Sequence, residues 1–252
     1  MIYSLGVLTL CSVLLLMTSP AYPAIEERLI HQTFSLNPGG TITLSNVDGD
    51  VIIQAWTGNR VDVKATKRGE AKDLDRVEII VNATPKHIHI ETDYPRHSNN
   101  IDVSVQYELM VPENAILETI RNVNGDIDVL GVEASIKAST VNGKVKIEGS
   151  KSSVEANTVN GKVSVTWAEF PKHGRVDMST VNGKVKLYLP EKTNATVEAT
   201  SMNGSIHCDF PITVKKGFLS NKLNGTIGAG GTIIDLTTIN GSIDIVKAAG
   251  SL

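Results

Sequence analysis

A short motif that occurs eight times constrains the fold of this chain more than any other feature. In each copy an apolar residue precedes Asn-Gly or Asp-Gly, and a β-branched residue follows two positions after the glycine. Residues 125–142 align with residues 143–160 without a gap, so that Ile127 matches Val145 and Ile136 matches Val154. Self-similarity at a nearly fixed period is the sequence signature of a repeat architecture. The chain is therefore expected to consist of stacked repeats.

The spacing of the later copies defines the repeat unit. Their glycines are separated by 18, 18, 22, 21, 21 and 16 residues. Apolar residues alternate both after each glycine and before each asparagine, which predicts two short strands per repeat. The longer intervals place their extra residues between these strands, where Pro171 and Pro190 stand outside a ladder. The predicted structural corners are Asn124-Gly125, Asn142-Gly143, Asn160-Gly161, Asn182-Gly183, Asn203-Gly204, Asn224-Gly225 and Asn240-Gly241.

Two structures compete for these corners. Asn142-Gly143 suits the tight type I′ turn of a β-hairpin. It also suits the corner of a parallel β-solenoid, in which glycine supplies a positive φ and stacked asparagines hydrogen-bond along the axis. Hairpins have no reason to repeat nearly the same sequence at a nearly fixed interval, so the pattern favours an all-β fold built as a parallel β-solenoid. The general preference for right-handed crossovers predicts a right-handed β-helix.

The chain divides into four predicted segments. Residues 1–24 form a signal peptide, 25–116 an N-terminal β region, 117–247 the solenoid repeat domain and 248–252 a C-terminal tail. Residues 25–116 alternate like short antiparallel strands with irregular connections, and they contain the first motif copy, so this region is expected to cap one end of the stack. At the other end, Ile243–Val246 is expected to be an exposed edge, open to a protein partner or a second copy.

The first residues indicate export. The apolar stretch from Leu5 to Met17 is too short to span a bilayer but suits a signal-peptide core, and Ser19-Pro20-Ala21 offers small residues for cleavage. No Lys or Arg precedes Leu5, so an uncleaved anchor or a misassigned start stays open. The expected location is the periplasm, the cell envelope or the extracellular space.

Composition excludes several classes of protein. Cys208 is the one cysteine after the leader, which rules out an intramolecular disulfide and a Cys-based metal site. Its place on the apolar phase of the repeat favours a small buried side chain over a reactive thiol. A formal charge of −3 and a pI near 6.1 argue against nucleic acid as a partner.

One stretch of the chain carries a family resemblance. Tyr107 to Pro112, followed through Leu117 by residues 122–129, is similar to the bacterial putative-adhesin family of β-strand-repeat cell-envelope proteins, a domain of unknown function. The resemblance implies an export signal or membrane anchor joined to a β-strand-rich region with Asn-Gly or Gly-Asp repeats. It implies no catalytic residues.

The residue after each corner glycine provides the most specific surface signal. Lys144, Lys162 and Lys184 should stack on consecutive coils, with Lys146 and Lys186 two residues further along the same face. These five lysines form a possible polyanion-binding stripe for envelope polysaccharide or lipid headgroups. The alternative is a solvated face on which lysine blocks aggregation, with Glu148, Glu155, Asp177 and Glu198 balancing the charge.

Metal and enzyme sites are weaker hypotheses. His87, His89 and Glu91 share one face of a strand and could bind zinc together with His97, but alternation with Ile88 and Ile90 explains the pattern without a metal. No catalytic motif or recurring carboxylate pair supports a polysaccharide-cleaving β-helix enzyme. We therefore assign no catalytic, metal or cofactor-binding residue and expect no cofactor.

The expected function is that of an exported, non-enzymatic β-repeat protein, an adhesin or cell-envelope interaction scaffold whose partner is an envelope polymer or a surface protein. One alternative is an envelope stress sensing or scaffolding module that binds a protein by strand addition near Ile245. A β-helix carbohydrate-active enzyme is the other. Self-association through the C-terminal solenoid edge is also a possible partner mode.

Overall fold

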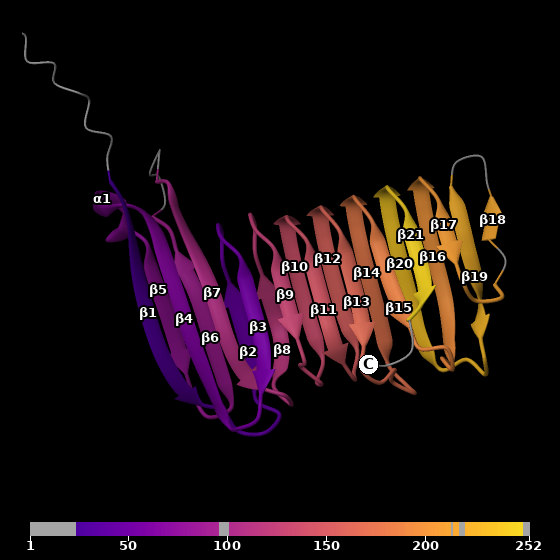
Figure 1. The fold of residues 1–252 in the computed structure, drawn as a ribbon, viewed down its shortest axis with the longest axis horizontal. Helices are drawn as coiled ribbons and strands as arrows, with labels where there is room; N and C mark the ends of the chain where they lie inside the picture. Colours follow the sequence, from indigo (N-terminus) through magenta and orange to yellow (C-terminus); the bar gives the residue numbers. More distant parts are fainter. Residues whose placement is uncertain (1–23, 96–100, 213, 217–219, 249–252) are drawn as a thin grey trace, which may run out of the picture.

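Two β-sheets face each other along the long axis of the molecule (Figure 1). The computed structural model describes residues 24–95, 101–212, 214–216 and 220–248, and the predicted signal peptide and most of the C-terminal tail lie outside them. In order along the axis, sheet A consists of β1 (Ile25–Ser35), β4 (Arg60–Glu70), β7 (Val103–Pro112), β3 (Val51–Trp56), β9 (Ile127–Leu130), β11 (Val145–Ser150), β13 (Val163–Trp167), β15 (Val185–Leu189), β21 (Ile243–Lys247) and β17 (Ile206–Cys208). Sheet B consists of β5 (Glu78–Ala83), β6 (His87–Asp93), β2 (Thr41–Ser45), β8 (Ile116–Arg121), β10 (Ile136–Asn142), β12 (Val154–Asn160), β14 (Arg175–Asn182), β20 (Thr232–Asn240), β16 (Ala195–Asn203), β19 (Asn221–Ile227) and β18 (Val214–Lys216). A single turn of helix, α1 (Ala71–Leu74), follows β4.

Each coil of the stack contributes one strand to each sheet. β10 passes through Asn142-Gly143 into β11, and the next coil repeats this path with β12, Asn160-Gly161 and β13. β10 and β12 pair in parallel and in register, with Ile136 opposite Val154. A hairpin would pair the consecutive strands β10 and β11 antiparallel, but these strands lie in different sheets. The parallel pairing of β10 with β12 therefore excludes the hairpin alternative and confirms the parallel solenoid.

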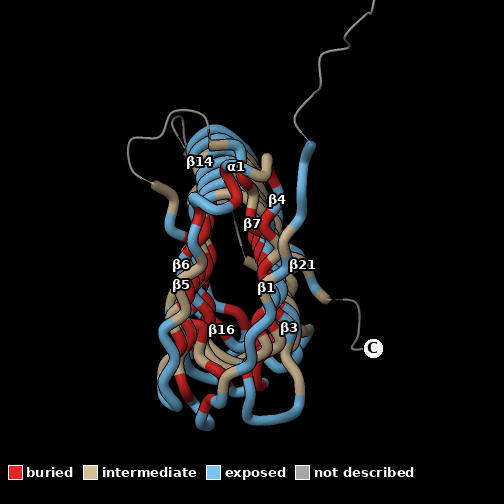
Figure 2. The backbone as a smooth tube through the Cα atoms, turned by 90° about the vertical axis from the view of Figure 1, so that its left-hand side faces the viewer, coloured by how far each residue is buried: buried red, intermediate tan, exposed pale blue. Residues whose placement is uncertain are grey.

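The core lies between the two sheets. Strand alternation points one aliphatic row of each strand inward, and Ile147, Val163 and Leu187 are fully buried there. Figure 2 shows the buried residues along the inner surfaces of the two walls. Burial of each such side chain stabilises the fold by about 1.5–3 kcal/mol, but a coil buries its row only when neighbouring coils cover it. Stability is therefore shared along the stack.

The corner glycines are required because successive backbones approach closely. A Cβ atom built on Gly183 would lie 1.8 Å from the carbonyl oxygen of Gly161, and one on Gly143 would lie 2.0 Å from that of Gly125. Gly125 has the expected positive φ, 139°. Gly183, Gly204 and Gly241 lie outside the left-handed region, so positive φ is not the general reason for glycine at these corners.

The corner asparagines form the hydrogen-bonded ladder that the sequence predicts. Asn160 Nδ2 donates to Asn142 Oδ1 and Asn182 Nδ2 donates to Asn160 Oδ1, both at 2.8 Å. The ladder continues in one direction through Asn124, Asn142, Asn160, Asn182, Asn240 and Asn203. Each internal amide of the ladder both donates and accepts, so one side-chain type satisfies its neighbours across these six stacked corners.

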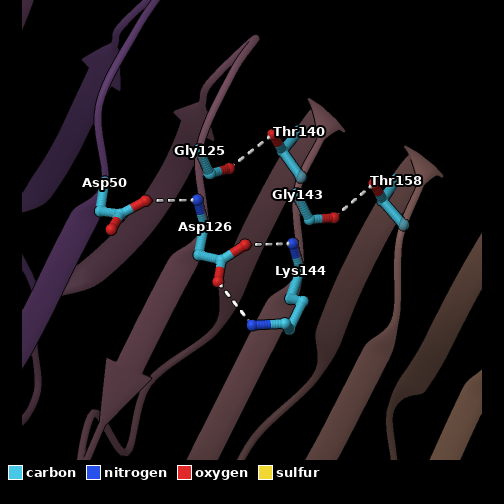
Figure 3. A network of polar contacts seen from close by, with 7 residues as sticks. All are labelled: Asp50, Gly125, Asp126, Thr140, Gly143, Lys144 and Thr158. Atoms are coloured by element: carbon cyan, nitrogen blue, oxygen red, sulfur yellow. Dashed lines mark hydrogen bonds and ion pairs between the residues drawn. The ribbon is translucent and has the colours of Figure 1, made fainter. Parts of the chain in front are cut away.

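A second ladder, not predicted from the sequence, runs beside the first. Thr158 Oγ1 donates to the carbonyl oxygen of Gly143 at 2.9 Å, and Thr140 makes the equivalent bond to Gly125 at 3.0 Å (Figure 3). Thr180, Thr238 and Ser201 repeat the contact on later coils. At these five corners the hydroxyl two residues before the asparagine satisfies a carbonyl at the tightest point of the stack, and Asn122 makes the equivalent bond to Gly49 before Asn124.

The coils do not stack in sequence order at the C-terminal end. β20 lies between β14 and β16, and β21 lies between β15 and β17, so the last coil of the chain is inserted inside the stack (Figure 1). The prediction of an exposed edge at Ile243–Val246 is therefore wrong, because β21 is paired on both sides. In the described chain, the outermost strands at this end are β17 and β18.

One predicted corner is absent. Asn224 and Gly225 lie inside β19, which runs antiparallel to β16 with Glu198 opposite Asn224. The chain must reverse here to bring β20 back into the stack, and this reversal uses an antiparallel strand instead of a coil. A Cβ on Gly225 would lie 2.6 Å from Ile212 Cγ2, so packing against this side chain accounts for the glycine.

The N-terminal region continues the same two sheets. β2 and β3 pair in parallel with β8 and β9, and the first motif copy docks on the stack through an Asp48–Asn124 bridge. β6 and β7 form a further coil outside β2 and β3. The predicted antiparallel arrangement is found at β1, β4 and β5, which end the two sheets.

Substitution of Gly183 by alanine should destabilise the protein by about 3 kcal/mol, because the methyl group must push two coils apart. The matched control is Gly39→Ala, at a glycine with φ of 72° and no atom within 4 Å of the added Cβ. There only the conformational cost of about 1–2 kcal/mol applies. Urea unfolding of both variants measures the difference, and equal losses would contradict the role of close approach.

Substitution of Asn160 by aspartate should cost about 1–2 kcal/mol at neutral pH, because the carboxylate faces Asn142 Oδ1 without a donor. This contact favours the protonated carboxyl, so the pKa of the new side chain is raised in the folded state. Stability relative to the wild type should then recover as the pH falls through that pKa. Thermal unfolding from pH 7 to pH 4 measures this, and an unchanged difference would contradict the ladder.

Candidate functional site

The outward face of sheet A carries all five lysines of the predicted stripe. Lys144, Lys162 and Lys184 follow the corner glycines of three successive coils, and we call these three the lysine ladder. Each lysine is one rung of this ladder. Backbone hydrogen bonds of 2.9 Å, from Val145 N to Lys162 O and from Val163 N to Lys184 O, hold the rungs in register. The lysines therefore stack on consecutive coils as the repeat requires.

The remaining two lysines form a second, interrupted column. Lys146 lies opposite Ser164, and Ser164 lies opposite Lys186, so a serine separates the two cations. Lys186 Nζ lies 4.8 Å from the centre of the Tyr188 ring. This spacing reduces the repulsion between the two ammonium groups.

Aspartates precede the lysine ladder on the same column. Asp50 Oδ1 accepts the backbone N–H of Asp126 at 2.8 Å, and Asp126 Oδ1 accepts that of Lys144 at 2.7 Å (Figure 3). The second oxygen of Asp126 forms an ion pair of 2.8 Å with Lys144 Nζ. This role of the aspartates was not predicted, although the residues that follow the glycines change from Asp to Lys between Asp126 and Lys144.

Other carboxylates neutralise much of the stripe. Glu148 lies 2.7 Å from Lys146 Nζ, and Asp244 lies 3.2 Å from Lys184 Nζ. Lys162 forms no ion pair with any residue that the structure describes. The face is therefore one of mixed charge, with an unpaired cation at the middle rung.

These contacts shift the pKa of the acids in different directions. Burial raises the pKa of Asp126, but hydrogen bonds from the Lys144 side chain and backbone outweigh it, so the pKa lies below its ordinary value. At Asp128 burial dominates and raises the pKa. Both aspartates line a groove of about 400 Å³ together with Lys144, Lys146 and Lys162. The groove also exposes apolar side chains of Ile52 and Leu130, so charges of both signs lie beside an apolar patch there.

The outward face of sheet B carries an opposite pattern. Glu155, Asp177, Asp235 and Glu198 stand on four successive coils in one column, and we call these four the acidic ladder. Lys137 continues the column and lies 3.4 Å from Glu155, and Arg175 pairs with Asp177 at 3.6 Å and with Asp235. Burial raises the pKa of Asp177, and so do Asp235 and Glu155, against the opposing charge of Arg175. Each acid stands five residues before a corner asparagine, a signal that the sequence contained.

The histidines of β6 are engaged by hydroxyl groups. His87 Nδ1 lies 2.7 Å from Thr41 Oγ1, and His89 Nδ1 lies 2.9 Å from Thr43 Oγ1. His89 Nε2 lies 3.4 Å from Glu91. Among the described residues no group of three or more His, Cys, Asp or Glu side chains is placed to hold a metal ion. His97, the remaining member of the zinc hypothesis, lies outside the described residues.

Cys208 lies on β17, at the end of sheet A. It is half-buried, and burial raises the pKa of its thiol. A raised pKa disfavours the thiolate, which is the reactive form.

The chain belongs to the Toastrack DUF4097 family, whose sequence profile matches residues 119–246. The structure of a putative cell adhesion protein from Clostridium sporogenes has the same fold, with a TM-score of 0.53 and 16% identity, covering 88% of this chain and 100% of that one. A putative adhesin from Bacteroides fragilis has a TM-score of 0.43 and 13% identity, covering 86% and 97%. Among curated proteins, no sequence matches this chain. The protein is thus a β-repeat protein with the fold of this family.

In the described part of the chain, no helix is long and apolar enough to cross a membrane. The predicted leader, including Leu5 to Met17, lies outside that part.

Replacement of Lys144 by methionine should raise the pKa of Asp126, because the ion pair is lost while the burial of the carboxyl remains. Asp126 stabilises the wild type above the unfolded pKa of its carboxyl, and this contribution is lost as the pH falls through the lowered folded pKa. A ¹³C NMR titration of the carboxyl measures the shift. Lys137→Met, on the other face, is the control, and an equal change in both variants would contradict the pairing.

Proposed function

We propose that this protein is an exported, non-catalytic adhesin-like scaffold that binds an anionic polymer of the cell envelope through the outward face of sheet A. The observation that carries the proposal is the lysine ladder, which repeats one cation per coil on a rigid sheet. Successive rungs are about 4.8 Å apart, the spacing of neighbouring strands. A chain of regularly spaced anionic groups suits such a row better than a compact ligand does.

The distribution of charge supports the choice of face. The acidic ladder makes sheet B repulsive to a polyanion, whereas sheet A offers the unpaired Lys162 between two paired lysines. In the ion pairs of Lys144 and Lys184 the lysines are exposed and the aspartates part-buried, and ion pairs that solvent reaches in this way contribute only about 0–1 kcal/mol each. Anionic groups of a polymer can therefore replace Asp126 and Asp244 at small cost. Binding of this kind is weak per rung and falls with ionic strength.

Multivalency compensates for weak rungs. A polymer that contacts one lysine is held near the next, so that the second contact forms at high effective concentration. The solenoid fixes the rungs in place, and binding does not have to order them first.

The test is binding to immobilised dextran sulfate and to isolated bacterial envelope fractions across a salt series, with uncharged dextran as the ligand control. The variant Lys144→Glu, Lys162→Glu, Lys184→Glu should lose at least about tenfold in affinity. Its matched control is Lys86→Glu, Lys192→Glu, Lys222→Glu, which changes net charge equally with exposed lysines outside this face. The control should bind within about twofold of the wild type.

Equal losses in the two variants would reduce the effect to net charge and contradict the proposal. Salt-insensitive binding would contradict it as well, because a contact made by exposed charges must be screened.

A further inference from the structure

Every rung of the asparagine ladder is followed by glycine. The rungs, in order along the stack, are Asn124, Asn142, Asn160, Asn182, Asn240 and Asn203. Asn-Gly is the sequence most open to one reaction of proteins, in which the backbone nitrogen of the second residue attacks the side-chain amide carbon of the first. Glycine carries no side chain that hinders this approach. Since all six corners share the sequence, the surroundings of each corner decide whether it reacts.

At an interior corner the next coil holds both reacting groups. Gly143 N–H donates to the carbonyl oxygen of Asn160 at 3.1 Å, and Asn142 Oδ1 accepts from Asn160 Nδ2 at 2.8 Å. The same two bonds join Gly161 and Asn160 to Asn182 of the following coil, at 3.0 and 2.8 Å. Both bonds point along the stack, so the nitrogen is directed toward the next coil and away from its own side chain. Attack therefore requires local opening of the stack.

Asn203-Gly204 is the last corner of the ladder. The coil of β16 and β17 has no further coil beyond it in the described chain, since β17 ends sheet A and β19 follows β16 antiparallel (Figure 1). Among the residues that the structure describes, none accepts from the Gly204 N–H or donates to Asn203 Oδ1. Gly204 is exposed, whereas the other five corner glycines are half-buried. Both reacting groups are thus free and within reach of water.

One part of this corner is covered. Asn221 Nδ2 donates to the carbonyl oxygen of Gly204, in place of the hydroxyl that a next coil would supply. At an interior corner, Thr180 makes this bond to Gly161. The Gly204 carbonyl belongs to the peptide group after the glycine, whereas the attacking nitrogen belongs to the peptide group before it. The end of the ladder is therefore closed at the carbonyl and open at the amide.

The shape of the last corner does not account for the difference. Asn203 pairs in register with Asn240, and its side-chain amide donates to Asn240 Oδ1 at 2.9 Å. A Cβ atom built on Gly204 would lie 1.7 Å from the carbonyl oxygen of Gly241, an approach as close as at the interior corners. On its inner side the last corner is packed like the others, and only its outer side lacks a neighbouring coil.

We infer that Asn203 is a site of spontaneous deamidation and that the interior rungs of the ladder are protected from the same reaction. Hydroxide removes the proton of Gly204 N, and this nitrogen attacks Cγ of Asn203. The N–Cγ bond forms, the Cγ–Nδ2 bond breaks, and Nδ2 leaves as ammonia after taking a proton from water. A second water molecule then opens the cyclic imide at either of its carbonyl groups, which yields aspartate or isoaspartate.

Either product weakens the attachment of the last coil. A carboxylate cannot donate to Asn240 Oδ1, so the bond between the last two rungs is lost. In isoaspartate the main chain runs through the side chain and is one carbon longer, which displaces β17 from its register with β21. β17 has only three residues and one neighbouring strand in its sheet, so few backbone hydrogen bonds hold it in place.

The test is deamidation of the folded protein in mildly alkaline buffer, with the same protein in concentrated urea as the reference. Peptic digestion at low pH, followed by mass spectrometry, measures the extent of reaction at each asparagine. The rate in urea divided by the rate in the folded state gives the protection of each rung, free of sequence effects. Asn203 should be at least about tenfold less protected than Asn142, Asn160 and Asn182, because interior rungs react only after local opening. Equal protection of all four asparagines would overturn the inference.

Hydrogen exchange tests the consequence for the last coil. Aged protein should exchange the amides of Ile206–Cys208 faster than fresh protein does, with no change in β11 and β13. The matched control is Asn203→Gln, in which the amide can still donate but the larger ring forms far more slowly. Aged and fresh samples of this variant should exchange alike.

Deamidated wild type that exchanges like fresh protein would contradict the role of the last rung, and so would an aged Gln variant that loosens as much as the wild type. The protection of the rungs is measured on the wild type alone, so that result stands whether or not the variant folds.

Discussion

Close packing of backbone against backbone at the Asn-Gly corners is the constraint on which the rest of the structure depends. The carbonyl oxygen of one corner glycine occupies the position where a side chain of the next would begin, as the 1.8 Å approach at Gly183 illustrates. A carbonyl so enclosed needs a donor, and the hydroxyl of Thr180 supplies it on the inner side. The amide of Asn182 closes the outer side by bonding to its neighbour. The hydroxyl residue, the asparagine and the glycine of each corner thus form one unit, which we call the joint. The joint fixes the register of both sheets.

Much of the fold is predictable from sequence because the residues of each joint are close together in the chain and recur as a recognisable motif. The alignment of residues 125–142 with 143–160 predicts the parallel register that β10 and β12 adopt. The order of the coils is not predictable in this way, since a repeat specifies that coils stack and not which coil lies next to which. Gly241 approaches Gly183 as closely as Gly143 approaches Gly125. The motif therefore has the same sequence at an inserted coil as at a sequential one, and the insertion of β20 and β21 cannot be recognised from it. Asn224-Gly225 shows the converse, because the same two residues inside an antiparallel strand look like a corner.

The candidate site was partly predictable for the same reason. The period of the repeat places Lys144, Lys162 and Lys184 in one column without any knowledge of the sheets. The repeat also places Asp126 next to Lys144, whereas the pairing of Asp244 with Lys184 was not predictable, since Asp244 reaches Lys184 only through the out-of-order last coil. The acidic ladder also depends on this insertion, because Asp235 fills the rung between Asp177 and Glu198. Charge patterning on both faces is therefore a product of topology as much as of repetition.

The displaced coils at the two ends restrict how this architecture can vary in length. After β15 the chain leaves one coil position empty and forms the outer coil of β16 and β17. It then returns, and β20 and β21 fill the empty position between that coil and the coil of β14 and β15. At the N-terminal end β6 and β7 enclose β2 and β3 in a similar manner. A duplicated coil inserted at either end would separate strands that must meet. Between β8 and β15 the order is sequential, and a whole coil can be added or removed there with every joint preserved. The copies most alike in sequence, residues 125–142 and 143–160, lie within that central section, where lengthening by duplication leaves both ends intact.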